Sequence, residues 1–216
     1  MTFDALLSAA RDRQLDIFGA FHPAPEDNVP HETGTLLLLG PHEPGFWNRL
    51  STSDEWRSGK PDPIDRWSRR IIGEWACALG AKALFPFTGP PYNPFFTWAL
   101  RSGQAWQSPV SLLVHSRAGL MVSYRGALAL KERIALPEVS AHSPCADCTK
   151  PCLTACPAGA LTAEGYDVAA CHSFLDTPEG LENMERGCAV RRSCPVSQSY
   201  GRLEAQSAYH MSVFHR

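Results

Sequence analysis

The sequence predicts an α+β protein made of an N-terminal body and a small cysteine-rich appendage. Helix-like and strand-like patterns alternate over the first 137 residues, and seven of the eight cysteines lie from residue 145 onward. At about 150 residues per domain, a chain of 216 residues has room for roughly one and a half domains. We therefore expect one domain over residues 1–137 and a second, smaller domain with the C-terminal tail over residues 141–216.

Composition narrows the class of protein and its partners. Hydrophobic residues make up 44% of the chain and charged residues 19%, which is typical of a globular protein. The net charge of −2 gives no basic excess for nucleic acid. The longest aliphatic run, Leu36–Leu39, is far shorter than the ~20 apolar residues of a membrane span. The segment Met1–Asp4 lacks the features of a signal peptide. We expect a cytoplasmic protein with no nucleic-acid or membrane partner.

The first elements follow from local periodicity. Apolar residues recur at helical spacing over residues 2–14, which predicts a helix. Residues 15–21 read as a strand, and residues 35–39 form a short aliphatic run suited to a buried strand. The polar, proline-containing segment 23–33 between them predicts a loop.

A longer helix is predicted from residue 62. Asp62 stands at the N-cap, Pro63 at the first helical position, and Gly80 ends the helix. A short strand at 83–85 follows. Cys77, in the same helix, is predicted to be a small buried residue. Within this helix we expect Trp67, Ile71 and Trp75 to be core residues and not cofactor contacts. The apolar face of the helix consists of Ile64, Trp67, Ile71, Ile72, Trp75, Ala76 and Leu79.

The remainder of the N-terminal body is aromatic and then strand-like. Residues 89–107 are rich in proline and aromatic side chains and predict a loop with about one helical turn. Residues 111–115 and 120–130 read as two strands joined by a turn at 116–119. Residues 136–143 are suited to a linker.

The cysteines of the appendage follow an iron–sulfur pattern. The run is Cys145-x2-Cys148-x3-Cys152-x3-Cys156-Pro157, and a second Cys-Pro pair stands at Cys194-Pro195. Bacterial ferredoxins use three closely spaced thiolates on one 4Fe–4S cluster and send the cysteine before proline to the other cluster. A zinc site is the alternative, but such sites usually pair two C-x2-C motifs, and the second motif is missing from this sequence.

The same rule assigns the ligands. The first 4Fe–4S cluster takes the four cysteines Cys145, Cys148, Cys152 and Cys194. The second takes the three cysteines Cys156, Cys171 and Cys188. Where a fourth cysteine is expected, the chain reads Ala189-Val-Arg-Arg-Ser193. The second site has therefore lost a ligand, uses another residue type, or is empty. His172 is a candidate ligand, and its alternative interpretation is a surface histidine. We predict a complete first cluster and a second one held by three thiolates.

Two stretches of the chain resemble known families. Leu113-Val-His115-Ser-Arg-Ala-Gly-Leu-Met-Val-Ser-Tyr-Arg125-Gly126 resembles the His-Pro-x-Phe-Gly-Gly-Trp-Phe-x-x-Arg-Gly stretch of the CblC-type cobalamin-processing proteins, and residues 62–65 (DPID) resemble their Asp-Pro-Val-Asp helix start. The tail from Cys145 is similar to the ferredoxin domain of epoxyqueuosine reductase, in which a cobalamin domain also comes first. The resemblance implies a nitroreductase-like cobalamin-binding domain followed by a bacterial-ferredoxin-like domain.

The resemblance also implies cofactor-binding residues. His115 would approach the corrin or one of its amides, or else cap a strand end. Arg125 and Gly126 would line the pocket that accepts a thiol in the CblC type, or else Arg125 would form a strand-edge salt bridge. Tyr92 and Phe96 belong to the aromatic segment that would cover a flat macrocycle, or else that segment is ordinary packing.

The predicted function combines both parts. The chain is expected to bind cobalamin and to reduce it, or its upper ligand, with electrons that reach the 4Fe–4S cluster from an external electron donor. One alternative is a cobalamin-dependent reductase of a small organic substrate, of the epoxyqueuosine or dehalogenase kind. That activity needs an acidic proton donor, and the Arg-Asp-Tyr-His stretch that carries it in epoxyqueuosine reductase is missing. The other alternative is a non-enzymatic electron carrier.

Overall fold

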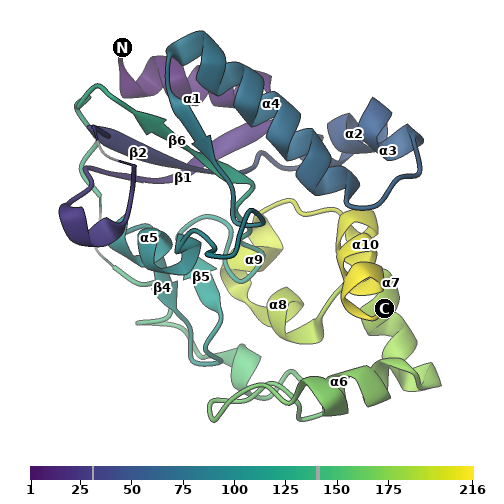
Figure 1. Cartoon of the computed structure of the whole chain (residues 1–216). Helices are drawn as coiled ribbons and strands as arrows, with labels where there is room; N and C mark the ends of the chain where they lie inside the picture. Colours follow the sequence, from purple (N-terminus) through teal and green to yellow (C-terminus); the bar gives the residue numbers. More distant parts are fainter. Residues whose placement is uncertain (31, 140–141) are drawn as a thin grey trace. The chain divides into compact units, whose positions relative to one another are not determined.

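The computed structural model describes residues 1–30, 32–139 and 142–216 (Figure 1). Contacts divide the chain into two compact units. The first, here called the sheet unit, comprises residues 1–104 and 123–141, and the second, the cysteine unit, comprises 105–122 and 142–216. Helices and small antiparallel sheets confirm the predicted α+β class. The nitroreductase-like and ferredoxin-like assignments, and the functions of the two predicted domains, remain predictions.

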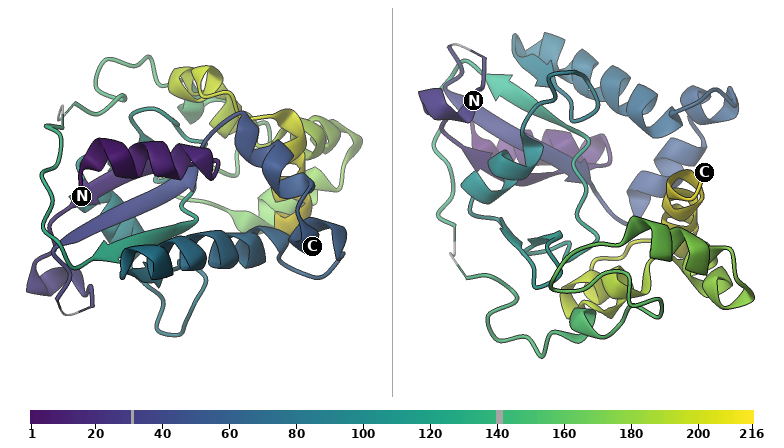
Figure 2. Two further views of the ribbon diagram at one scale, coloured as in Figure 1. Left: turned by 90° about the horizontal axis from the view of Figure 1, so that it is seen from above. Right: turned by 60° about the horizontal axis from the view of Figure 1, so that its bottom comes forward.

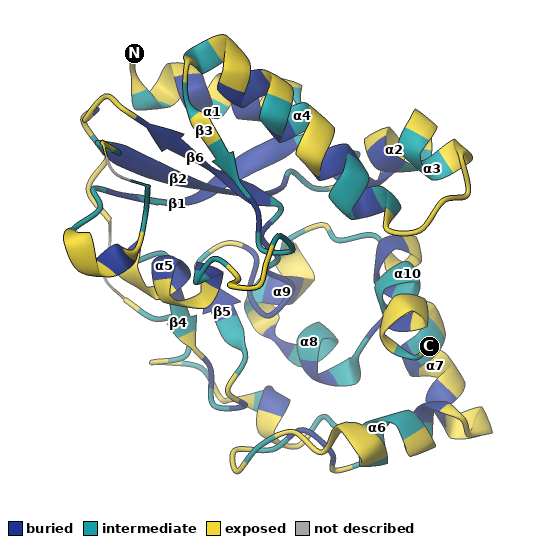
Figure 3. Ribbon diagram, viewed as in Figure 1, coloured by how far each residue is buried: buried dark blue, intermediate teal, exposed yellow. Residues whose placement is uncertain are grey.

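The sheet unit is built on a four-stranded antiparallel sheet. The strands are β1 (Leu15–Phe21), β2 (Thr35–Pro41), β6 (Gly126–Leu130) and β3 (Lys82–Leu84), in the order β1-β2-β6-β3. Every residue of β2 and β6 is buried, and Figure 3 shows both strands in dark blue. Continuous aliphatic runs suit strands that are covered on both faces, which explains why these segments do not alternate.

Helices cover this sheet. Figures 1 and 2 show α1 (Phe3–Asp12) and α4 (Pro63–Leu79) on one face and α5 (Phe95–Arg101) on the other. The Thr2 side chain caps α1 by accepting from the Ala5 N–H at 3.3 Å. The predicted helix at 2–14 and strands at 15–21 and 35–39 are confirmed. The unit also contains the short helices η1 (Pro25–Asp27), α2 (Gly45–Ser51) and α3 (Asp54–Arg57).

The ends of α4 agree only in part with the prediction. Gly80 ends the helix in the left-handed conformation, with φ of 63°, as expected. Asp62 stands at the N-cap but has φ of 54°, and its side chain makes no capping hydrogen bond. Cys77 is exposed, so the prediction that it is buried was wrong. It lies on the side of the helix opposite the buried Ile72 and Trp75, where a small residue contacts water.

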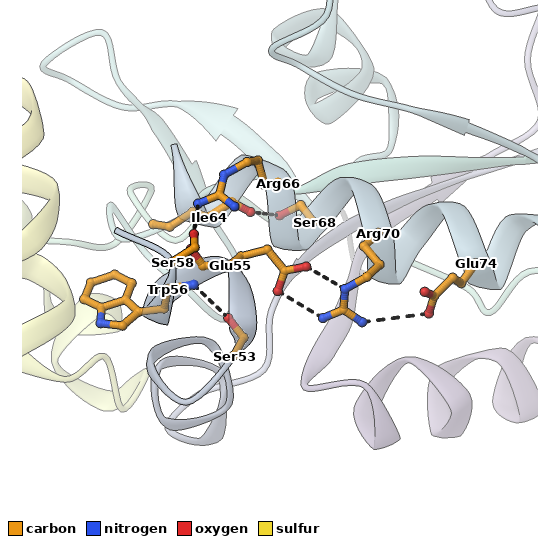
Figure 4. A network of polar contacts seen from close by, with 9 residues as sticks. All are labelled: Ser53, Glu55, Trp56, Ser58, Ile64, Arg66, Ser68, Arg70 and Glu74. Atoms are coloured by element: carbon orange, nitrogen blue, oxygen red, sulfur yellow. Dashed lines mark hydrogen bonds and ion pairs between the residues drawn. The ribbon is translucent and has the colours of Figure 1, made fainter. Parts of the chain in front are cut away.

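A polar network fastens α3 to α4 (Figure 4). The Arg70 guanidinium donates to both Glu55 carboxylate oxygens, at 2.6 and 3.1 Å. Arg66 donates to the backbone oxygens of Glu55 and Lys60, at 2.6 and 3.0 Å. The hydrogen bonds from Arg70 lower the pKa of Glu55 from 4.5 to about 2.

The cysteine unit holds a two-stranded sheet and short helices. Strand β4 (Ala105–Gln107) pairs antiparallel with β5 (Leu113–His115). In the described residues, no helix is long and apolar enough to cross a membrane. The helices of the unit are η2 (Pro151–Leu153), α6 (Val168–Leu175), η3 (Pro178–Gly180), α7 (Leu181–Arg186), α8 (Ala189–Ser193), α9 (Pro195–Ser199) and α10 (Glu204–Phe214).

Two predicted segments differ from the structure. The segments 111–115 and 120–130 do not pair with each other, because β5 pairs with β4 whereas β6 begins at Gly126 and pairs with β2 and β3. The segment 89–107 is less loop-like than expected, since it contains α5 and β4. The pairing of β6 with β2 and β3 joins segments far apart in the sequence and leaves no local signal, whereas α5 and the β4–β5 hairpin are local elements that the prediction missed. The predicted linker and the first loop include residues 140, 141 and 31, which lie outside the described residues.

Candidate metal centre

Four cysteines of the cysteine unit line one cavity. The cavity has a volume of about 380 Å³, within the range of small-ligand sites. Cys145, Cys148 and Cys152 come from a single loop, and Cys194 comes from a turn more than forty residues further along the chain. These are the four cysteines predicted to hold the first cluster. Folding therefore brings together the complete predicted ligand set.

Local hydrogen bonds shape the loop that carries three of these cysteines. The Ser143 hydroxyl accepts from the Cys145 N–H at 3.3 Å, and the Cys148 sulfur accepts from the Lys150 N–H at 3.3 Å. Lys150 is left-handed, with φ of 57°, and it starts the 3-10 turn η2 that buries Cys152. Amide N–H groups that donate to cysteine sulfur are a recurring feature of iron–sulfur sites.

An apolar cluster forms the floor of the site. These apolar side chains exclude water from the floor of the cavity, so a charge placed next to them is screened little. The Leu120 N–H donates to the Ser197 hydroxyl at 2.9 Å, which fastens the segment after β5 to α9. The buried residues of this cluster are Val110, Val114, Leu120, Cys152, Leu161, Val190 and Cys194.

The electrostatics of the four thiols favour a cationic occupant. Burial raises the pKa of Cys145, and the thiolates of Cys194 and Cys148 raise it further. Burial also raises the pKa of Cys152, with Cys145 and Cys148 as the next causes. A positively charged centre in the cavity would favour the thiolate forms of Cys145 and Cys152.

A buried hydroxyl lies in the wall of the same cavity. The Ser108 Oγ is shielded from water and has no hydrogen-bond partner among the described residues, and Ser108 is 6% exposed. Its backbone is satisfied, because the N–H donates to Leu112 O at 2.8 Å and the oxygen accepts from the Ser111 N–H at 2.9 Å. A buried hydroxyl without a partner costs about 1–3 kcal/mol. A sulfur-bearing occupant of the cavity would supply the missing acceptor.

The second predicted set also lies together. Burial raises the pKa of Cys171, and the charges of Cys188 and Cys156 raise it further. Burial also raises the pKa of Tyr166, which lies just before the N-cap of α6. The three thiols of this set therefore act on one another electrostatically.

His172 points to a different group of residues. Its Nδ1 lies 2.9 Å from Nδ1 of His215, whose Nε2 lies 2.9 Å from a carboxylate oxygen of Asp176. Its ring also packs on Phe214, with the ring centroids 4.6 Å apart. These contacts favour the interpretation of His172 as a structural residue over that of a cluster ligand.

The residues of the first cavity fit an iron–sulfur cluster. The described residues contain no group of three or more His, Cys, Asp or Glu positioned to hold a metal ion. The fit is judged instead from the four soft thiol donors around one cavity, the apolar floor and the orphaned hydroxyl of Ser108. Thiolate ligands, sulfur-directed hydrogen bonds and burial are what iron–sulfur clusters use.

His115 has a local structural task. It is fully buried, and its Nδ1 accepts from the Arg117 and Ala118 N–H groups, at 3.1 and 3.3 Å. Its backbone N–H and oxygen both bond Gly119. These contacts close the turn after β5 and support the capping alternative. His115 belongs to the cysteine unit, whereas Arg125 and Gly126 belong to the sheet unit.

Arg125 and Gly126 also have local partners. The Arg125 guanidinium pairs with Asp65 at 3.3 Å, which is the salt-bridge alternative. A Cβ on Gly126 would lie 2.8 Å from Ile72 Cδ1 and 3.0 Å from the Leu84 oxygen. Gly126 therefore allows β6 to pack closely under α4 and beside β3. Contact with cobalamin remains a prediction for both residues.

The aromatic segment divides into a buried half and an exposed half. Phe95 and Trp98 are core residues, and the Trp98 Nε1 donates to the Asp27 oxygen at 2.7 Å. Tyr92 is 64% exposed and Phe96 45% exposed. The two side chains predicted to cover a macrocycle are thus at the surface of the sheet unit.

Ser108 was not predicted from the sequence. It gives no local signal, because only folding brings the β4–β5 turn to the cysteines. Comparison with family models, curated proteins and solved structures found no match to this chain.

Proposed function

We propose that this protein is an iron–sulfur redox protein that binds cobalamin and reduces it, or its upper ligand, with electrons from a 4Fe–4S cluster. The observation that carries the proposal is the shared cavity of Cys145, Cys148, Cys152 and Cys194. The cobalamin part rests on the resemblance of residues 113–126 to the CblC-type stretch and on the order of the two parts along the chain.

The chain's own residues have defined tasks in this proposal. A 4Fe–4S cluster, when bound, supplies one-electron transfer. The four thiolates bind it, and the Lys150 N–H holds the Cys148 sulfur in place. The Ser108 hydroxyl would donate a hydrogen bond to the bound cluster, and the apolar side chains of Val114 and Leu120 would keep water away on their side of the cavity. Hydrogen bonds to sulfur and exclusion of water together set the potential of such a centre.

The experiment uses the anaerobically reconstituted full chain. The protein is reduced with dithionite, freed of excess reagent and mixed with cob(III)alamin, and the visible spectrum is followed. We expect binding followed by reduction of the cobalamin. Cys145→Ala should still bind cobalamin but not reduce it. Cys77→Ser, which changes an exposed cysteine of the sheet unit, is the matched control and should behave like the parent.

A second candidate function is a non-enzymatic electron carrier. Local contacts account for His115, which caps a turn, and for Arg125, which pairs with Asp65. A sheet unit that binds no cofactor would contain the same contacts. A reconstituted parent that transfers electrons to a redox dye but leaves the spectrum of added cobalamin unchanged would support this function and overturn the cobalamin proposal.

A further inference from the structure

Helix α8 borders the cavity that the four cysteines line. The helix spans Ala189–Ser193, with Cys188 at its N-cap and Cys194 at its C-cap. Cys194 lines the cavity, and Val190 is buried in the apolar floor of the site. Arg191 follows Val190 and stands three residues before Cys194, and residues three apart along a helix lie on the same side. A cation therefore occupies the middle of the helix that leads to this ligand.

A hydrogen bond holds the Arg191 side chain against the wall of the cavity. Its guanidinium donates to the backbone oxygen of Leu120, a residue that lines the cavity. The Leu120 N–H donates to the Ser197 hydroxyl at 2.9 Å. The backbone of Leu120 is thus bonded to α8 and to α9, the two helices that meet at Cys194. These contacts fix the positive charge of Arg191 beside a wall residue of the cavity.

Among the described residues, no carboxylate forms an ion pair with Arg191. Its side chain is partly buried there, and its hydrogen bond is to an uncharged carbonyl oxygen. Burial lowers the pKa of the guanidinium, as expected for a cation removed from water. The exposed Arg186 of the same unit differs, because it pairs with Glu204 at 2.7 Å and with Glu182 at 3.0 Å. A partly buried cation without a counter-ion is costly and favours an anion nearby.

The cavity provides such an anion when it holds a cluster. Although its irons are cationic, a 4Fe–4S cluster on four thiolates carries net negative charge, and this charge increases when the cluster accepts one electron from a reductant. A fixed cation nearby therefore stabilises the reduced form more than the oxidised form. The apolar side chains of Val114 and Leu120 in the same wall reduce the screening of this attraction.

We propose that the Arg191 guanidinium is the counter-charge of the iron–sulfur cluster in this cavity and raises the reduction potential of that cluster. The inference rests on the proposed function, in that the cavity holds a 4Fe–4S cluster. Arg191 does not bind iron, and it acts through its charge. At a separation on the order of 10 Å and an effective dielectric constant of about 20, one unit charge changes the equilibrium constant for reduction roughly tenfold. A tenfold change corresponds to about 59 mV for one electron.

The test compares four anaerobically reconstituted full-length proteins. Besides the parent, they are Arg191→Gln, which keeps an N–H donor for Leu120 but loses the charge, and Arg191→Lys, which keeps the charge. Arg186→Gln is the control, because the charge of an exposed arginine is screened by solvent. An EPR-monitored redox titration follows the signal that is lost in Cys145→Ala. We expect Arg191→Gln to lower the potential by about 59 mV, and the other two variants to keep the parent value.

Urea unfolding of the metal-free chains gives a second measurement. Because Arg191 has no ion pair among the described residues, metal-free Arg191→Gln should unfold at the same urea concentration as the parent or at a higher one. A lower midpoint would show that Arg191 is a structural residue and would overturn the inference. This outcome also covers a variant that fails to fold.

The remaining outcomes also decide the assignment. Loss of iron from Arg191→Gln but not from Arg191→Lys would support the counter-charge. An unchanged potential of Arg191→Gln at parent iron content would overturn it, as would equal shifts or equal iron losses in the two variants. These failures leave the proposed function intact, whereas a parent that takes up no iron would overturn both.

Discussion

Replacement of Ser108 by alanine tests the assignment of the cavity with two effects of opposite sign. Without a cluster, the Ser108 hydroxyl is buried and has no partner among the described residues. Removing such a group releases its desolvation penalty, so we expect the metal-free variant to be more stable to unfolding by about 1 kcal/mol. Ordinary serine-to-alanine changes that remove a satisfied hydrogen bond have the reverse effect.

With a cluster bound, the same change should lower its reduction potential. A hydrogen bond to a charged acceptor is worth about 1.5–3 kcal/mol, and it strengthens when an electron adds negative charge. If the strengthening is on the order of 1 kcal/mol, the one-electron potential falls by roughly 40 mV in the variant, since about 59 mV corresponds to a tenfold change. The apolar neighbours Val114 and Leu120 leave little water to replace the lost donor.

Two measurements check these effects. Urea unfolding of the metal-free chain gives the change in stability, and an EPR-monitored redox titration of the loaded chain gives the potential. Ser111→Ala is the control, because Ser111 lies in the same turn but is exposed, and it should change neither quantity. A metal-free Ser108→Ala protein that is less stable than the parent would show that the hydroxyl has a partner. An unchanged potential at full cluster content would show that it does not face the cluster.

Three further predictions concern the sheet unit. Gly126→Ala should lower the free energy of unfolding by about 1–3 kcal/mol in thermal or urea denaturation, because the added methyl group is crowded. Gly73→Ala is the control at a helix position with open space around it, and it should raise the free energy of unfolding by about 0.5–1 kcal/mol. Equal effects of the two changes would contradict the packing argument. The pKa of Glu55 is about 2 in the folded protein and 4.5 without its partners. The ionised carboxylate therefore contributes about 1 kcal/mol to the free energy of unfolding above pH 4.5, and this contribution is lost as the pH falls toward 2. The free energy of unfolding of Glu55→Gln should therefore lie below that of the parent at neutral pH and approach it near pH 2. A difference between the two proteins that stays constant with pH would refute the ion pair. Arg125→Met should weaken cobalamin binding in a spectral titration and leave the iron content unchanged. Burial already raises the pKa of Asp65, and the loss of the Arg125 guanidinium should raise the pKa of Asp65 further.

Local signals predicted the elements that depend on local physics. Strand β1 begins and ends at the predicted residues, and Gly80 ends α4 in the left-handed conformation. Cysteine spacing also predicted that Cys145, Cys148 and Cys152 share a cavity, because ligand spacing within one loop is a local property, whereas Cys194 was assigned from the ferredoxin rule for the cysteine before proline. These features are fixed within a few residues of chain, so their physical causes can be read from the sequence.

Features that depend on distant segments could not be predicted. Nothing near residues 126–130 indicates that this strand pairs with β2, about ninety residues earlier in the chain, and not with the strand at 113–115. Asp62 has the side chain of an N-cap, but its left-handed backbone turns that side chain away from the helix end. Ser108 lines the cavity only because folding brings the cysteines beside its turn.

The segment 105–122 changes which residues belong to the proposed cluster site. By sequence, every cysteine of the cavity lies after residue 144, which predicts a tail that would hold a cluster alone. Ser108, Val114 and Leu120 nevertheless line the cavity, and Val110 packs in its floor. A fragment that starts at residue 141 would keep the thiols but lack the apolar wall and the hydroxyl. A cluster bound by such a fragment would be exposed to water on that side, so we expect its potential and its lifetime in air to depend on residues 105–122 as well as on the cysteines.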